Sequence, residues 1–156
     1  MVIFKSKNKI AIIGNGGSAA IASHFAVDLI KSGNIRSSPI KAFSLTDNSA
    51  LLTATANDYK YDEVFSWQLK EIANPGDLLF AISSSGNSTN ILNAIQCAKE
   101  LNVHSISLTG FDGGKAAAMA DIALVAKSEI GNYGPVEDVH SIVCHYISRQ
   151  VRFTNV

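Results

Sequence analysis

Five short, mainly apolar runs alternate along this chain with longer segments of helical periodicity. The runs occupy residues 9–13, 40–45, 77–82, 104–110 and 122–126. Near-continuous apolar strands are typical of a parallel sheet that helices cover on both faces. In the intervening segments, hydrophobic residues recur at helical spacing, which predicts helices over residues 18–32, 49–56, 61–72, 90–101, 115–119 and 136–152. The alternation predicts an α/β fold, a three-layer α-β-α sandwich around a five-stranded parallel sheet.

The length and composition of the chain predict one domain that associates with other subunits. A chain of 156 residues suits a single domain over residues 1–156. Hydrophobic residues make up 47% of the chain and charged residues only 17%, below the ~25% of an average globular domain. A lone chain this short exposes much of its area, so we expect another subunit to cover part of the surface.

Charge and cysteine content exclude several classes of function. Thirteen basic and thirteen acidic residues cancel, which argues against a nucleic-acid or anionic membrane surface. No apolar stretch approaches the ~20 residues of a membrane span. Cys97 and Cys144 lie within helical patterns and lack CxxC spacing. They are typical of buried thiols in a reducing compartment, so we expect a cytoplasmic protein.

The first apolar run ends in a glycine-rich loop, "GNGGSAA", at residues 14–20. Glycines let the backbone approach a ligand closely, and Ser18 is expected to cap a helix whose N-terminus favours an anion. The candidate phosphate contacts in this loop are Asn15, Gly16, Gly17 and Ser18. The same letters fit a dinucleotide pattern, G-x-G-x-x-A, and a plain tight turn explains them nearly as well.

The third apolar run ends in "SSSGNS", at residues 83–88, and this loop favours a phosphate over a dinucleotide or a plain turn. A capping residue followed by a polar turn accounts for only two of its six residues. Several short donors without any Lys or Arg suit a compact phosphate monoester held by hydroxyl groups and a helix terminus. Both loops follow strands, and ligands bind at the carboxyl ends of strands in such sheets. The candidate contacts here are Ser83, Ser84, Ser85, Asn87 and Ser88.

His24 and Asp28 are four residues apart on the first predicted helix, so they share one helical face. His145 lies on the last predicted helix. A lone His on a helix is more often structural, but His24 with Asp28 after a phosphate loop favours a functional role. Interconversion of a ketose and an aldose phosphate needs a base over adjacent carbons and an acid at the carbonyl oxygen.

Five stretches together resemble the sugar isomerase (SIS) domain family, and within it the bacterial sedoheptulose 7-phosphate isomerases. The similarity runs from about Lys9 to Tyr146. It implies a Rossmann-like or flavodoxin-like fold and conversion of sedoheptulose 7-phosphate to D-glycero-D-manno-heptose 7-phosphate through an enediol. The product would supply heptose for lipopolysaccharide or capsule. The stretches are "GNGGSAAIASHFAVDL", "NDYKYDEVFSWQL", "PGDLLFAISSSGNSTNIL", "SLTGFDGGK" and "VEDVHSIVCH".

The resemblance also implies roles for individual residues. It makes Asp28 and His145 the catalytic acid–base pair and makes Asn57 and Asp58 partners of substrate hydroxyls. It implies a zinc ion, or another divalent cation, held by a set of His and carboxylate ligands. That set is His24, Asp28, Glu137 and His145, with Asp138 in reserve because it lies seven residues from His145.

Four positions depart from the pattern of the heptose isomerases. Asp28 stands where the family usually has Glu, and Glu137 where it has Gln. An Arg one turn beyond the helix-one acid falls near Ser32, and an Asp before the last helix falls near Gly134. A carboxylate withdrawn by roughly 1 Å could cost on the order of a hundredfold in rate.

The resemblance further implies an assembly, and two other functions remain open. Heptose isomerases carry an N-terminal helical segment, whereas here the first strand begins almost at once. We therefore expect an obligate homo-oligomer, a dimer or tetramer, with its active site at a subunit interface. One alternative function is a non-catalytic phosphosugar-binding or regulatory SIS module, which the Ser32 and Gly134 departures favour. The other is a dinucleotide-dependent oxidoreductase, which rests only on Gly14, Gly16 and Ala19.

Overall fold

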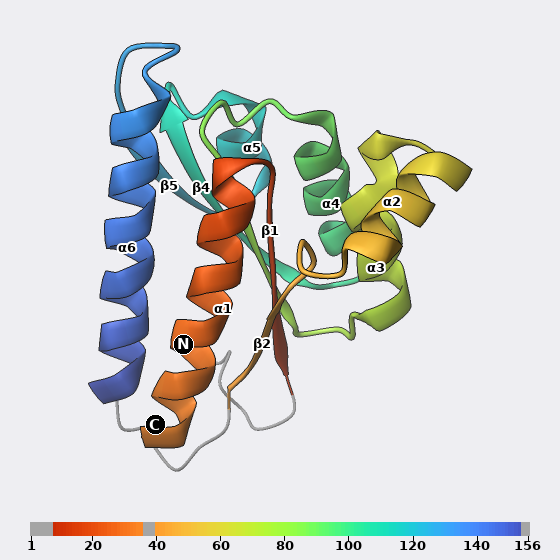
Figure 1. Ribbon diagram of the computed structural model, residues 1–156, viewed down its shortest axis with the longest axis horizontal. Helices are drawn as coiled ribbons and strands as arrows, with labels where there is room; N and C mark the ends of the chain where they lie inside the picture. Colours follow the sequence, from red (N-terminus) through yellow and green to blue (C-terminus); the bar gives the residue numbers. More distant parts are fainter. Residues whose placement is uncertain (1–7, 36–39, 154–156) are drawn as a thin grey trace.

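The computed structural model describes residues 8–35 and 40–153, and its centre is a five-stranded parallel sheet (Figure 1). The strand order is β2-β1-β3-β4-β5, and every neighbouring pair runs parallel. This confirms the fold expected from the alternation of apolar runs and helices. The strands are β1 (Lys9–Gly14), β2 (Lys41–Ser44), β3 (Leu78–Ser83), β4 (His104–Phe111) and β5 (Ile122–Lys127).

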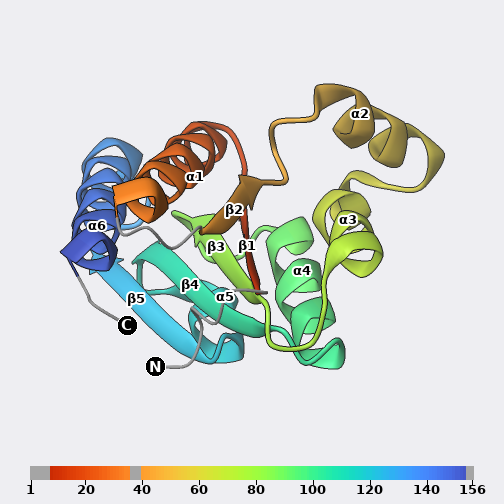
Figure 2. The ribbon, with the colours of Figure 1, turned by 90° about the horizontal axis from the view of Figure 1, so that it is seen from below.

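Helices cover both faces of the sheet (Figure 2). Helices α1 and α6 pack side by side on one face, and α3, α4 and α5 cover the other. Helix α2 projects from the edge of the molecule, where only Thr55 of its residues is buried. Within residues 8–35 and 40–153, no helix has the length and apolar character needed to cross a membrane. The helices are α1 (Gly17–Ile35), α2 (Ser49–Asp58), α3 (Val64–Ile72), α4 (Thr89–Glu100), α5 (Gly114–Met119) and α6 (Tyr133–Phe153).

Alternation along the strands divides the core into two clusters. Ile10 and Ile12 of β1 face α1 and α6, whereas Ala11 and Ile13 face α3 and α4, because successive side chains of a strand point to opposite faces. Phe80 of β3 packs edge to face against Phe25 of α1, with the two ring centroids 5.0 Å apart. The central strands β1 and β3 are buried on both faces and almost wholly apolar, as the sequence indicated. The edge strand β5 is partly exposed, and β4 carries the buried polar residues Ser105, Ser107 and Thr109.

The segment 61–72 is not the single helix that its periodicity predicted. It begins with a 3₁₀ turn, Tyr61–Glu63, and α3 starts only at Val64. The Ser66 hydroxyl donates to the Glu63 carboxylate at 2.8 Å and to the Glu63 carbonyl at 3.3 Å. Because this side chain competes for a backbone acceptor, the 3₁₀ turn does not merge into a continuous α-helix.

One ionisable group of α6 is fully buried against the sheet. His140 has no exposed surface, and neither ring nitrogen has a hydrogen-bond partner among the described residues. Desolvation by burial lowers the pKa of His140. The Thr109 backbone, which falls short of hydrogen-bond geometry, and the Glu137 charge act in the opposite direction but do not reverse the shift. The native protein therefore holds this imidazole neutral.

We expect His140 to make the protein less stable in mild acid. Below the ordinary His pKa of about 6.5, the unfolded chain binds a proton at this position more readily than the native state does. The free energy of unfolding therefore falls as pH drops below that value. Urea denaturation at pH 7.5 and pH 5.5 should show a smaller fall for His140→Leu than for the wild type. The control is His104→Leu, at an exposed position, and equal falls in all three proteins would contradict the prediction.

Candidate active site

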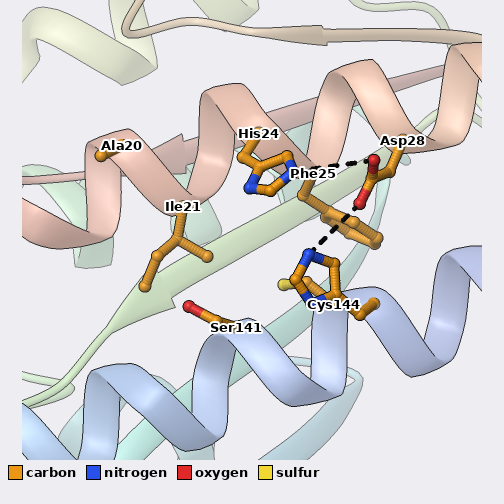
Figure 3. Close-up of a pocket in the computed structure, with 8 residues that line it drawn as sticks. Ala20, Ile21, His24, Phe25, Asp28, Ser141 and Cys144 are labelled. Carbon is orange, nitrogen blue, oxygen red and sulfur yellow. Dashed lines mark ion pairs between the residues drawn. The ribbon is translucent and has the colours of Figure 1, made fainter.

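His24, Asp28 and His145 meet between α1 and α6 (Figure 3). The Asp28 carboxylate lies between the two imidazoles: Oδ1 is 3.7 Å from His24 Nε2, and Oδ2 is 3.6 Å from His145 Nε2. The two imidazole rings meet edge to face, with centroids 5.0 Å apart. The structure thus brings together three of the residues expected to hold a metal or move protons. They are called the triad below.

The helix pair positions the triad. His24 and Asp28 are one turn apart on α1, so both point toward α6. Deeper in the same interface, the Ser32 hydroxyl donates to the Ser148 carbonyl at 3.1 Å and ties the two helices together. The histidine side chains remain more than half exposed, whereas the Asp28 side chain is 24% exposed. The hydrogen bond between the two helices therefore holds the triad in place, while its histidines remain open to solvent.

The triad has the donor set and spacing of a divalent cation site. One ligand atom from each residue lies within 4.8 Å of the others. Ligands at about 2.0–2.2 Å from zinc in a tetrahedron lie about 3.3–3.5 Å from one another. The separations of 3.6 and 3.7 Å involve different oxygens of Asp28, so the three side chains would have to close in from a set that fits within 4.8 Å to hold one ion. Two His and one carboxylate also leave a coordination position free for substrate, as in catalytic zinc sites.

A cavity surrounds the triad, and its floor is apolar. Its lining residues outside the triad are Ala20, Ile21, Phe25, Ser141 and Cys144. Burial, with a smaller contribution from the Asp28 charge, raises the pKa of the Cys144 thiol to about 12. Cys144 therefore stays a neutral thiol beneath the triad and does not compete as a nucleophile. This space is the triad cavity.

A second cavity, of about 170 Å³, opens at the carboxyl ends of β1 and β3. Gly14 at the end of β1 pairs with Ile82 of β3, and the strand order reverses between these strands, which is where ligands bind in open α/β sheets. Among the described residues, no Lys or Arg lines this cavity. It is called the serine-loop cavity, and its lining residues are Asn15, Ser18, Ile82, Ser83, Ser84, Ser85, Ser88, Tyr133 and Glu137.

The serine loop itself holds unused hydrogen-bonding capacity. Ser84 is 6% exposed, yet its hydroxyl has no hydrogen-bond partner among the described residues. The hydroxyl oxygens of Ser83 and Ser85 accept from the backbone N–H groups of Gly86 and Asn87, both at 3.2 Å, so their protons remain available to a ligand. A buried polar group without a partner is costly, and an anion in this cavity would satisfy it.

The first loop differs slightly from the sequence prediction. Helix α1 begins at Gly17, so Ser18 lies in the first turn and is not the capping residue. Gly16 has a φ of +54°, and its carbonyl already accepts from the Ala19 N–H at 3.0 Å. Positive φ favours glycine. The turn follows the end of β1, and α1 starts one residue earlier than expected.

Six predicted site residues lie outside the cavity or triad expected for them in this single chain, and two of them, Gly16 and Gly17, line neither cavity. Asn57 and Asp58 are exposed at the end of α2 and line neither cavity. Asn87 holds the serine loop in place, because its Nδ2 donates to the Ser85 carbonyl at 3.0 Å and its Oδ1 accepts from the Lys115 N–H at 3.1 Å. Glu137 stands outside the triad, against Gly17: a Cβ on Gly17 would lie 2.7 Å from both carboxylate oxygens.

Tyr133 and Ser141 are cavity residues that the sequence did not single out. Tyr133 opens α6 beside the serine loop, and Ser141 lies one turn before His145. The spacing of Ser141 from Glu137 and His145, at four residues each, was the available signal for its shared face. Nothing in the local sequence marks Tyr133, because its position depends on how α6 approaches β3.

The two cavities lie along the same pair of helices. Gly17 faces Glu137 at one level, and Asp28 faces His145 at another, so α1 and α6 run in parallel. Residues 137 and 145 are separated by about 12 Å along the helix axis.

Comparisons with known proteins show which family this chain resembles. The family model for the SIS domain matches residues 2–110. A phosphoheptose isomerase from Synechocystis sp. is 40% identical over 95% of this chain and 75% of its own length. One from Aliarcobacter butzleri is 44% identical over 92% of this chain and 75% of its own length. Among solved structures, the phosphoheptose isomerase from Neisseria gonorrhoeae matches with a TM-score of 0.89 and 36% identity, over 97% of this chain and 80% of that one.

The family model covers more than half of this chain, and the relatives match more than nine tenths of it. The chain therefore belongs to the SIS domain family, among the relatives of the phosphoheptose isomerases.

Proposed function

We propose that this protein interconverts sedoheptulose 7-phosphate and D-glycero-D-manno-heptose 7-phosphate. The single observation that carries the proposal is the placement of two chemically different cavities on one helix pair. The serine-loop cavity offers uncharged donors for a phosphate, and the triad offers imidazole and carboxylate for the sugar carbonyl. The similarity to phosphoheptose isomerases supports the heptose as substrate.

The phosphate end of the substrate binds in the serine-loop cavity. The Ser84 hydroxyl, which lacks a protein partner, donates to a phosphate oxygen, and the hydroxyl protons of Ser83 and Ser85 add further donors. The first turn of α1 lies beside the cavity through Ser18, and its free N–H groups favour an anion. Without Lys or Arg, the ester is oriented mainly by hydrogen bonds, which suits a substrate that must leave after each turnover.

The carbonyl end of the substrate lies at the triad. A base removes the proton from one of two adjacent carbons while an acid supplies a proton to the carbonyl oxygen, which gives the enediol. Return of a proton to the other carbon and loss of a hydroxyl proton complete the isomerisation. We assign the acid–base roles to Asp28 and His145, which lie in contact across the helix interface.

The triad residues would hold a divalent cation, and zinc suits two imidazoles and a carboxylate. When bound, such an ion would polarise the carbonyl oxygen and stabilise negative charge that develops on it. His24 and His145 remain more than half exposed, so substrate can reach the same side of the site. Glu137 would complete the expected ligand set only if its side chain turned from Gly17 toward the triad.

Activity should depend on the triad and on the serine loop in different ways. Asp28→Asn removes the carboxylate and should lower kcat by about a hundredfold or more. Ser84→Ala removes a donor to the phosphate and should raise KM by about tenfold with a smaller effect on kcat. The measurement is conversion of sedoheptulose 7-phosphate with added divalent metal, followed by NMR. Absence of the aldose above background in the wild type would refute the isomerase proposal.

Zinc should stabilise the wild-type protein through the triad. Addition of ZnCl₂ to metal-free protein should raise the melting temperature, because an ion that binds only the native state stabilises it by mass action. Asp28→Asn should weaken zinc binding by about a hundredfold or more, since loss of even an outer partner costs up to that much. The control is Asp62→Asn, an exposed carboxylate outside the triad. Equal zinc effects in the two variants would show that the ion binds elsewhere.

We further propose that a second copy of the chain covers the outer face of α1 and α6, in a cytoplasmic homo-oligomer. Large apolar side chains lie exposed on both of these helices, which also carry the triad, and exposed apolar surface of this kind is typical of interfaces. Two buried free cysteines support a reducing compartment. The exposed residues are Val27, Ile30, Ile142 and Tyr146.

Sedimentation equilibrium tests the assembly. The wild type should be at least a dimer at micromolar concentration, and Ile142→Asp should shift it toward monomer because a charge would then enter an apolar interface. Lys60→Asp, an exposed change outside α1 and α6, is the control and should leave the assembly intact. A wild-type monomer would contradict the proposal.

A non-catalytic phosphosugar-binding module is the second candidate. Ser32 and Gly134 stand where the heptose isomerases carry Arg and Asp, and Ser32 is buried with its hydroxyl committed to the Ser148 carbonyl. Neither position supplies a charged group to the substrate. Binding of the sugar phosphate without turnover, with or without metal, would favour this candidate over the isomerase.

A further inference from the structure

Three polar side chains from separate segments meet beside the serine-loop cavity. Asn15 follows β1, Asn90 lies in the first turn of α4, and Tyr61 opens the 3₁₀ turn before α3. Asn15 and Asn90 form a reciprocal amide pair in which each Nδ2 donates to the other's Oδ1 at 2.9 Å. The Tyr61 hydroxyl donates to the same Asn15 oxygen, also at 2.9 Å. The three bonds join parts of the chain that are 46 and 75 residues apart.

The Asn15 side chain has one hydrogen-bonding group left for a ligand. Its oxygen accepts twice, from Asn90 and from Tyr61, so both lone pairs are occupied. Its Nδ2 carries two hydrogens, and one is donated to Asn90. In the described part of the chain no protein partner takes the other. Because Asn15 lines the serine-loop cavity, its side chain offers a ligand there a donor and not an acceptor.

Tyr61 favours one of the two orientations that the Asn15 side-chain amide could adopt. The reciprocal pair would survive if both amides turned over together, since each would still donate once and accept once. In that turned state the Asn15 oxygen would be left for the cavity, where it would repel a phosphate oxygen. In the turned state the Tyr61 hydroxyl would face the Asn15 Nδ2 and could only accept from it, so the phenol proton would lose the acceptor that it now has in the Asn15 oxygen.

We propose that Tyr61 and Asn90 are positioning residues for phosphate binding, which hold the Asn15 amide so that its free N–H serves the ligand. The inference rests on the proposed function, which puts a phosphate ester in the serine-loop cavity. Asn90 is 2% exposed, so its amide needs a hydrogen-bond partner simply because it is buried. Tyr61 is 57% exposed, so burial does not explain why its hydroxyl bonds to Asn15. The amide pair also ties the loop after β1 to the start of α4, so the cavity is formed before the ligand arrives and less ordering is needed on binding.

The experiment compares two single-hydroxyl deletions. Tyr61→Phe removes the hydroxyl that orients Asn15, whereas Tyr59→Phe removes one two residues away on an equally exposed ring. For each protein, calorimetry gives the Kd of inorganic phosphate, and steady-state assays give KM and kcat for sedoheptulose 7-phosphate. Tyr61→Phe should raise Kd and KM by about three- to tenfold, with kcat within about twofold and the melting temperature equal to that of Tyr59→Phe. Asn90→Asp keeps the acceptor but loses the donor, and it should raise Kd further.

The outcomes separate this inference from the proposed function. If the wild type binds phosphate and Tyr61→Phe binds it equally well, the inference is overturned and the proposed function stands. A lower melting temperature for Tyr61→Phe without a change in Kd or KM would also overturn it, because the hydroxyl would then only stabilise the fold. A wild type that binds neither phosphate nor the sugar phosphate would refute the proposed function, and the inference with it.

Discussion

The packing of α1 against α6 across one face of the sheet is the constraint that positions the whole candidate site. Phe25 of α1 packs on Phe80 of β3, and Ser32 bonds to α6, so the helix pair is fixed to the sheet and to itself. Asp28 can then lie against His145, which is far away in sequence. A small rotation of either helix would separate the triad, because each ligand depends on which helical face is turned inward.

The phosphate end of the site depends on a different principle. Parallel strands β1 and β3 end side by side, so their following loops converge at one edge of the sheet. Serine hydroxyls, the first turn of α1 and the Asn15 amide supply donors, and the hydrogen bonds within the loops hold them in place. A site of this kind obtains its selectivity from geometry, because hydroxyl donors have short reach and no net charge.

Two carboxylates distinguish this site from the family pattern in opposite ways. Asp28 is one methylene shorter than the usual Glu, yet the structure still brings it between two imidazoles, at 3.6 and 3.7 Å. Glu137 lies beside Gly17 in the serine-loop cavity, where its charge opposes an anionic ligand. For the phosphate ester of the proposed function, this carboxylate would oppose binding where a neutral Gln would not.

The fold class and most of the triad could be predicted from the order of residues alone, and the ligand-binding role of the two loops stays a prediction. Apolar runs specify buried parallel strands, "SSSGNS" contains more donors than a turn requires, and the His24–Asp28 spacing fixes a shared helical face. These features are local, so periodicity and composition record them. Other features emerge only in the folded chain: Glu137 faces Gly17, Asn87 serves its own loop, and Asn15 is bound by Asn90 and Tyr61. Those arrangements depend on contacts between distant segments, whose relative positions are set by the packing of helices on the sheet and leave no trace in local spacing.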